Sequence, residues 1–157
     1  MRPSLEFAKG LFGERQIEGV EVGVDIGENA ADILLNWSNI AKLYLVDPVD
    51  NIHDRFKVEG DRIKFINKYS VDGAKEVEDN TLDFVYLDGD HSFKGVMVDF
   101  NAWYPKLKVG GVICGHDFAP ADIETKECVA WASTVFFKEK GLELFTSGPD
   151  FWGIKKC

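Results

Sequence analysis

Two groups of titratable side chains follow hydrophobic runs in this sequence. The stretch DFVYLDGDHSF reaches Asp88 and then His91, and the stretch VICGHDF contains His116 and Asp117. A carboxylate beside an imidazole can hold a divalent cation, or it can orient the imidazole to remove a proton from a hydroxyl at neutral pH. Acids that terminate long apolar runs are poorly explained by packing. We therefore expect Asp88 and Asp117 to be functional.

Two chemistries remain open for these residues. In the first, Asp88, His116 and Asp117 hold a divalent ion such as Mn²⁺ or Fe²⁺, which accepts mixed histidine and carboxylate ligands more readily than Mg²⁺ does. In the second, the site contains no metal, and His91 or His116 acts as a general base oriented by Asp88 or Asp117. Asp90 is interpreted as a solvated residue outside either arrangement.

A second candidate site is the turn in EVGVDIGENA, where Gly23 and Gly27 flank a predicted strand-to-helix junction. Residues without a Cβ let a ligand approach the backbone, and a helix N-terminus offers unpaired N–H groups. The G-x-x-x-G spacing lacks the additional glycine with which dinucleotide-binding folds admit a pyrophosphate. Asp47, 20 residues after Gly27, ends the next strand-like run and could accept both hydroxyls of a ribose. Together these features favour a nucleoside ligand.

These candidates must be positioned by an alternation of short β-like runs and amphipathic helical windows, which is typical of a sheet covered on both faces. The predicted strands span 19–27, 41–48, 62–70, 81–89 and 112–118, and the helical windows span 28–39, 92–107 and 122–141. Residues 142–156 predict an antiparallel hairpin around Ser147, Gly148 and Pro149. We therefore expect a single-domain, Rossmann-like, doubly wound α/β fold with a mixed seven-stranded sheet. The chain would form one domain over 1–157, with 1–19 as a leading helical segment whose N-cap is Ser4.

Each helical window has an apolar stripe that predicts its buried face. The predicted core residues are Ala30, Ile33, Leu34 and Trp37; Val96, Phe100, Trp103 and Leu107; and Cys128, Trp131, Ala132, Val135 and Phe136. Trp152 is expected to pack within the last strand, and Cys114 is expected to be a small core residue.

Composition excludes several classes of partner. The 157 residues include 27 Asp and Glu against 18 Lys and Arg, a net charge of −9 without a basic cluster, which disfavours nucleic acid and anionic lipid. No apolar run approaches the roughly 20 residues that span a bilayer. The three cysteines have no CxxC spacing, so neither a disulfide framework nor a zinc cluster is expected. The opening MRPSLEFAKG lacks a signal-peptide pattern, so a cytoplasmic protein acting on a small molecule is expected.

The segments EVGVDIG, LVDP, DFVYLDGDHSFKGVMVDFNAWYPKLKVGGVICGHDF and FWGIKK together resemble class I S-adenosylmethionine-dependent methyltransferases. The resemblance is to the small-molecule branch with the signature IDGDHSY…D…W…L…GGVI…DD, and it covers Val20 to Lys156. It implies that S-adenosylmethionine is the cofactor. It also implies methyl transfer to a small-molecule acceptor, for which we expect an oxygen nucleophile on a sugar or secondary metabolite.

The resemblance also implies a set of cofactor-binding residues, which are Glu21, Gly23, Val24, Gly27, Asp47, Pro48, Ser70 and Asp88. In such proteins the residues matching Glu21, Gly23 and Gly27 surround the methionine part. The position of Asp47 contacts the ribose, and that of Ser70 lies near the adenine.

One departure from the family pattern bears on the metal. Asp88 matches the acid between cofactor and acceptor, but His116 and Asp117 stand where metal-dependent relatives have paired acids. Because one acid is replaced by His116, metal-free chemistry is favoured, and a divalent metal remains the alternative.

Two other functions compete with methyl transfer. A non-catalytic S-adenosylmethionine-binding module is motivated by the short leading segment over 1–19 and by the lack of a long insertion that could cover the acceptor. The same missing lid suggests a homo-oligomer in which a second subunit completes the site. A nicotinamide-dependent oxidoreductase would instead bind NAD.

Overall fold

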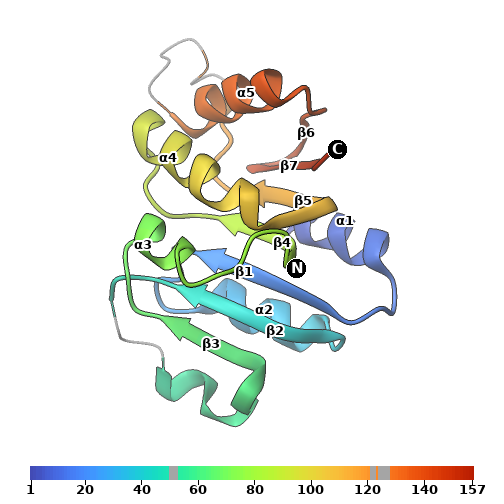
Figure 1. The fold of residues 1–157 in the computed structure, drawn as a ribbon, viewed down its shortest axis with the longest axis vertical. Helices are drawn as coiled ribbons and strands as arrows, with labels where there is room; N and C mark the ends of the chain where they lie inside the picture. Colours follow the sequence, from blue (N-terminus) through green and yellow to red (C-terminus); the bar gives the residue numbers. More distant parts are fainter. Residues whose placement is uncertain (50–52, 121–122, 124–127) are drawn as a thin grey trace.

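The computed structural model describes residues 1–49, 53–120, 123 and 128–157, and its centre is a seven-stranded mixed sheet (Figure 1). The strands are β1 (Ile17–Val22), β2 (Ile40–Val46), β3 (Ile63–Ile66), β4 (Leu82–Leu87), β5 (Leu107–Gly115), β6 (Phe145–Ser147) and β7 (Asp150–Ile154). They are arranged in the order β3-β2-β1-β4-β5-β7-β6. β7 runs antiparallel to both β5 and β6, and the pairings among the first five strands are parallel. The expected fold class, including the C-terminal hairpin, is confirmed.

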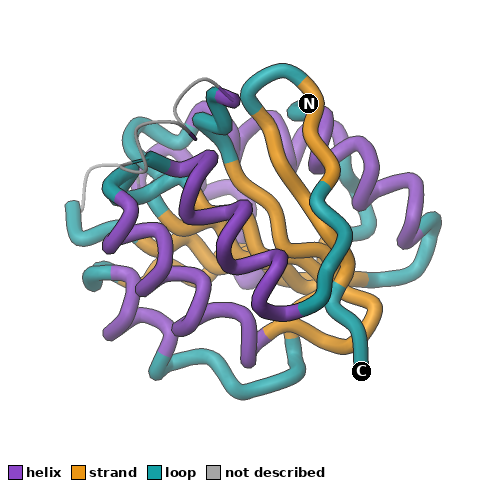
Figure 2. Tube along the Cα trace, turned by 90° about the horizontal axis from the view of Figure 1, so that it is seen from above, coloured by secondary structure: helices purple, strands orange, loops and turns teal. Residues whose placement is uncertain are grey.

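Helices cover both faces of the sheet. They are α1 (Pro3–Phe12), α2 (Glu28–Asn36), α3 (Ser70–Ala74), α4 (Phe93–Trp103) and α5 (Val129–Lys140), with 3₁₀ segments η1 (His53–Arg62) and η2 (Tyr104–Lys106). In Figure 1, α3, α4 and α5 lie in front of the sheet, and α1 and α2 lie behind it. The view from above in Figure 2 shows the strands between these two helical layers. Each side has its own core, with Phe100 central to one and Trp37 to the other. No helix among the described residues is long and apolar enough to cross a membrane.

The apolar stripes of the first two helical windows are buried as predicted. All eight residues are at most 8% exposed, from Ala30 in α2 to Leu107 after α4. The prediction for the third window is wrong for Cys128, Trp131 and Val135, which are only half-buried. In α5 the buried positions are Val129, Ala130, Ala132, Ser133, Phe136 and Phe137. Apolar residues nearly surround VAWASTVFF, so its periodicity could not select the face that packs on α4. Residues 122 and 124–127 of that window lie outside the described part.

Three strands differ from their predicted spans by four or five residues at one end. β1 ends at Val22, five residues before the predicted end at 27, because Gly23 turns the chain with a φ of +83°. β5 begins at Leu107, five residues before the predicted start at 112, since Gly110 adopts a φ of +80° within the strand instead of ending the preceding element. β3 ends at Ile66, so Ser70 opens α3 and does not lie in the strand. Ser70 nevertheless follows β3 at the carboxyl edge of the sheet.

The leading segment forms α1 and is tied to the sheet edge. The N-cap is Arg2, and the prediction of Ser4 is wrong because Pro3, whose fixed φ suits the first helical position, starts the helix two residues earlier. Ser4 is buried in the first turn, where its Oγ donates to Asp150 Oδ2 at 2.6 Å and its N–H donates to the same oxygen at 3.1 Å. These bonds hold Arg2 beside the carboxyl ends of the central strands.

Candidate functional site

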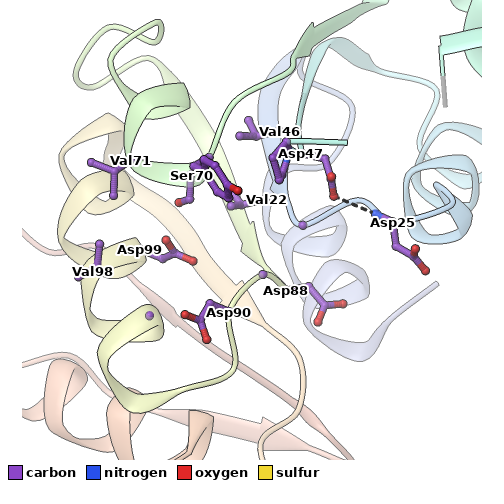
Figure 3. A pocket seen from close by; sticks show the side chains of 15 residues that line it. Val22, Asp25, Val46, Asp47, Ser70, Val71, Asp88, Asp90, Val98 and Asp99 are labelled. Atoms are coloured by element: carbon purple, nitrogen blue, oxygen red, sulfur yellow. Dashed lines mark hydrogen bonds between the residues drawn. The ribbon is translucent and has the colours of Figure 1, made fainter. Parts of the chain in front are cut away.

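A pocket of about 460 Å³ opens at the carboxyl ends of β1, β2 and β4, and it is shown in Figure 3. Strand order reverses between β1 and β4, and open α/β sheets bind ligands at such a switch point. Of the predicted cofactor residues, the pocket is lined by Gly23, Asp47, Pro48, Ser70 and Asp88. The tertiary structure therefore brings together residues from three strand ends that are distant in sequence.

Asp47 is fixed at the end of β2 by backbone donors. Its Oδ2 accepts from the N–H groups of Val24 at 2.9 Å and Asp25 at 3.1 Å, and its Oδ1 accepts from Val49 N–H at 2.8 Å. Figure 3 shows the bond to Asp25, which holds a φ of +50° in the turn after β1. A carboxylate oxygen can accept more than one hydrogen bond, so Asp47 remains able to receive hydroxyl donors from a ligand.

The glycines of the turn are required by close packing. Gly23 has a φ of +83°, and a Cβ there would overlap the backbone oxygen of Asp88. Gly27 has a φ of +77°, and a Cβ there would come within 2.8 Å of the Phe56 ring. Gly23 therefore lets the ends of β1 and β4 approach each other, which brings Asp88 to the wall of the pocket.

Glu21, Val24 and Gly27 lie behind this wall, where they are buried. Glu21 is only 2% exposed, and Oε2 has no hydrogen-bond partner among the described residues. Burial raises the pKa of Glu21 to about 8, and the neighbouring Asn29 opposes that shift. A buried carboxyl group with an unused oxygen, next to a ligand-sized pocket, is suited to receiving a cationic group.

The opposite wall of the pocket joins α3 to α4. Trp103 Nε1 donates to Ser70 Oγ at 2.9 Å, and Asp99 lies beside Ser70 (Figure 3). Asp99 is 6% exposed, and burial raises its pKa to about 6. Asp99 was not among the predicted site residues. The signal was present, because Asp99 lies three residues after Val96 and four before Trp103 and so occupies the apolar stripe of its helix.

Asp88, His91, His116 and Asp117 converge at the ends of β4 and β5. His91 Nε2 lies 3.3 Å from Asp88 Oδ1 and 3.3 Å from Asp117 Oδ2, and His116 Nδ1 lies 3.2 Å from Asp117 Oδ1. Burial raises the pKa of Asp88, whereas the neighbouring His116 lowers it. Asp117 holds a φ of +61°, a conformation that non-glycine residues adopt mainly where the surroundings impose it.

The neighbours of this group have simpler roles. Asp90 is exposed, as predicted, and its Oδ1 accepts from Ser92 N–H at 2.9 Å, although it also lines the pocket. Ser92 is the N-cap of α4 and accepts from Gly95 N–H at 3.1 Å, so His91 is not the cap. The imidazole of His91 is 53% exposed and can therefore meet a ligand.

Arg2 is a member of the cluster that the sequence analysis did not identify. Its Nη1 contacts Nε2 of His116, although the two residues are 114 positions apart. Both imidazole nitrogens of His116 therefore have partners, Arg2 at Nε2 and Asp117 at Nδ1. No motif in MRPSLEF indicates this contact, since it depends on how α1 packs against the sheet.

The three predicted metal ligands lie close enough together to share one ion. One ligand atom from each of Asp88, His116 and Asp117 lies within 4.8 Å of the others. Their spacing and their mixed nitrogen and oxygen donors are compatible with a divalent transition ion. Arg2, however, already supplies a positive charge at His116, and a metal centre of this kind would not require that contact.

A second pocket of about 320 Å³ adjoins the cluster on the side away from Asp47. It is lined by His91 and Asp117, and by apolar groups that include Phe118, Val129 and Pro149. A small cavity that reaches both Asp88 and His91 lies between the two pockets. A group bound in the second pocket would therefore meet the first pocket at these two side chains.

Comparisons with known proteins place this geometry in a family context. A family model described as "Methyltransferase domain" matches residues 20–118. An uncharacterised protein of Acanthamoeba polyphaga mimivirus is 28% identical over 127 residues, covering 73% of this chain and 57% of that protein.

Solved structures share the fold. MycE methyltransferase from the mycinamycin biosynthetic pathway, in complex with Mg and SAH, has a TM-score of 0.75 at 17% identity, covering 98% of this chain and 49% of that one. The 1,6-didemethyltoxoflavin-N1-methyltransferase of Burkholderia thailandensis, with 1,6-didemethyltoxoflavin and S-adenosylhomocysteine bound, has a TM-score of 0.74 at 11% identity, covering 99% of this chain and 78% of that one. The chain thus spans about half the length of the viral relative and of MycE.

Proposed function

Because the chain belongs to the methyltransferase-domain family, we propose that it transfers a methyl group from S-adenosylmethionine to a small-molecule acceptor. When bound, the cofactor supplies an electrophilic methyl group on a sulfonium. The observation that carries the proposal is the pocket at the switch point, with the acid Asp47 at one end and Asp88 next to the second pocket.

The residues around the pocket suit the parts of this cofactor. Asp47, fixed by three backbone donors, would accept the ribose hydroxyls. The buried carboxyl of Glu21, with Oε2 unused by the described residues, would face the methionine ammonium behind the Gly23 turn. Ser70 would lie near the adenine, where Asp99 adds a second polar group. The assignments of Val24, Gly27 and Pro48 rest on the resemblance in sequence.

His91 is the general base that the geometry favours. Its Nε2 faces a carboxylate oxygen of Asp88 and one of Asp117, so Nε2 must carry the hydrogen, and Nδ1 retains a lone pair. His116 has both nitrogens engaged and would act by holding Asp117. In this arrangement His91 Nδ1 accepts the proton of the acceptor hydroxyl, and Asp88 and Asp117 stabilise the imidazolium that forms. A divalent ion held by Asp88, His116 and Asp117 remains the alternative.

The acceptor is proposed to bind in the second pocket through an oxygen nucleophile. Phe118, Val129 and Pro149 suit an apolar body, and His91 lies where a hydroxyl would meet the first pocket. A secondary metabolite with a hydroxyl on a ring, or a sugar attached to such a body, combines these features.

The test is calorimetric titration with S-adenosylhomocysteine and, in parallel, with NAD, followed by transfer of a radiolabelled methyl group to a panel of phenols and sugars. We expect S-adenosylhomocysteine to bind and NAD not to bind. We also expect transfer to at least one hydroxyl acceptor, reduced at least 100-fold in His91→Ala. Binding of NAD alone would refute the proposal in favour of an oxidoreductase. Cofactor binding without transfer to any acceptor would favour a non-catalytic binding module.

Three broader properties belong to the same proposal. We expect the domain to extend over 1–157, because α1 packs against β5, β6 and β7. We also expect a cytoplasmic location and a homo-oligomer in which a second copy covers the acceptor pocket. Sedimentation that shows only monomer at working concentration would contradict the last expectation.

A further inference from the structure

Arg2 places a permanent positive charge among the acids of the cluster. It precedes α1, and the bonds of Ser4 to Asp150 hold the start of that helix against the sheet. Its guanidinium contacts His116 and is close enough to Glu21 and Asp88 to oppose the rise in pKa that burial causes in both carboxyl groups. Arginine remains protonated throughout the physiological pH range, so this charge does not switch off.

The contact between Arg2 and His116 determines which imidazole nitrogen carries the hydrogen. A guanidinium only donates, so Nε2 of His116 must accept and cannot be protonated. The neutral ring then carries its hydrogen on Nδ1, which faces Asp117 Oδ1 at 3.2 Å as a donor. A metal bound at Nδ1 would need that hydrogen removed and Nε2 protonated, and a protonated Nε2 would face Arg2 donor to donor.

We infer that Arg2 takes the place of a divalent cation in this cluster and keeps Asp88, His116 and Asp117 free of metal. The same contact locks His116 as the Nδ1–H tautomer, so that it supports Asp117 and cannot itself act as a base. Arg2 is thus a positioning residue. Its role in catalysis rests on the proposed function, but its effect on metal binding does not.

Binding of Mn²⁺, followed by electron paramagnetic resonance and calorimetry, tests the inference without any measurement of methyl transfer. We expect one saturable Mn²⁺ site in Arg2→Ala and none in the wild type. Any residual Mn²⁺ binding by the wild type should be at least tenfold weaker than binding by Arg2→Ala. This site should be lost again when His116→Ala is added. Lys9→Ala is the matched control, because it removes one positive charge from the same helix at a residue whose ammonium donates to the Asn36 carbonyl. It should bind Mn²⁺ like the wild type.

A second measurement keeps the test decisive if Arg2→Ala does not fold. The chain has three histidines, so two-bond ¹H–¹⁵N correlation spectra can assign each ring. We expect His116 to be the Nδ1–H tautomer in the wild type, with its ¹⁵Nε2 resonance shifted by the hydrogen bond from Arg2. In Arg2→Met this shift should be lost, while Asp117 keeps the hydrogen on Nδ1. An Mn²⁺ affinity that is unchanged in Arg2→Ala, or an Nε2–H tautomer in the wild type, would overturn the inference. Failure of every variant to bind S-adenosylhomocysteine would count against the proposed function and leave the Mn²⁺ and tautomer results valid.

Discussion

Replacement of Glu21 by glutamine should remove a large part of the pH dependence of stability. Burial raises the pKa of Glu21 from 4.5 to about 8. The folded state therefore binds a proton that the unfolded state has released, and the stability of the wild type should fall as pH rises from about 4.5 and level off above about 8. Glutamine has nearly the same shape as the protonated acid but does not ionise.

The size of the effect follows from the difference between the two pKa values. A difference of about 3.5 units corresponds to about 5 kcal/mol when it is fully developed, of which about 3 to 4 kcal/mol develops between pH 5 and pH 8. The free energy of unfolding of Glu21→Gln, relative to wild type, should therefore rise by that amount over this interval. The absolute offset between the two proteins is less informative, because the glutamine amide has its own hydrogen-bonding needs.

Urea unfolding followed by tryptophan fluorescence at pH 5, 6, 7 and 8 measures this difference. The matched control is Glu143→Gln, which changes an exposed glutamate and should give a curve parallel to that of the wild type. If the curves of Glu21→Gln and wild type also run parallel within about 0.5 kcal/mol, then Glu21 is ionised in the folded protein without ligand, and the conclusion that burial raises its pKa is refuted.

Three further predictions concern the walls of the pocket. Asp47→Asn should weaken S-adenosylhomocysteine binding about 10- to 100-fold in calorimetry, because the amide nitrogen cannot accept a ribose hydroxyl, and unchanged affinity would remove Asp47 from the site. Gly23→Ala should lower the free energy of unfolding by roughly 2 to 6 kcal/mol, because residue 23 has a φ of +83° and an added Cβ would overlap the Asp88 carbonyl. Gly10→Ala has open space around it and should not destabilise the protein, so equal effects of the two substitutions would refute the explanation by close packing. Asp99→Asn should gain about 2 kcal/mol in stability relative to wild type as pH rises from about 4 to 7, since a pKa raised to about 6 makes ionisation costly in the folded state. A constant difference in urea unfolding over that range would contradict it.

Local patterns in the sequence predicted most of the fold. Alternating β-like runs and helical windows predicted the sheet and its helical layers, because the periods of strands and helices differ and each run requires a partner to cover it. The turn Ser147–Gly148–Pro149 predicted the final hairpin for the same local reason. Since parallel strands present their carboxyl ends at one edge, the residues at those ends could also be selected, and Asp47, Ser70 and Asp88 do line one pocket.

Features that depend on packing between elements were not predictable in this way. The buried face of α5 was assigned incorrectly at Trp131, because apolar residues nearly surround that helix and only its contact with α4 selects a side. Asp99 was not predicted as a site residue, because a single acid on an apolar stripe is recognised as functional only when the pocket beside it is known. Gly23 was predicted to admit a ligand, and the structure adds that it admits the backbone of Asp88.

The sequence by itself determined the fold class, the edge of the sheet at which the site lies and the residue types available there, because these follow from local periodicity and from the shared direction of parallel strands. Only the tertiary structure decided how those residues meet. It placed His91 between two carboxylates and brought Arg2 across 114 positions onto His116. The hydrogen on each imidazole follows from such contacts, since it depends on which donor or acceptor packing places beside each nitrogen.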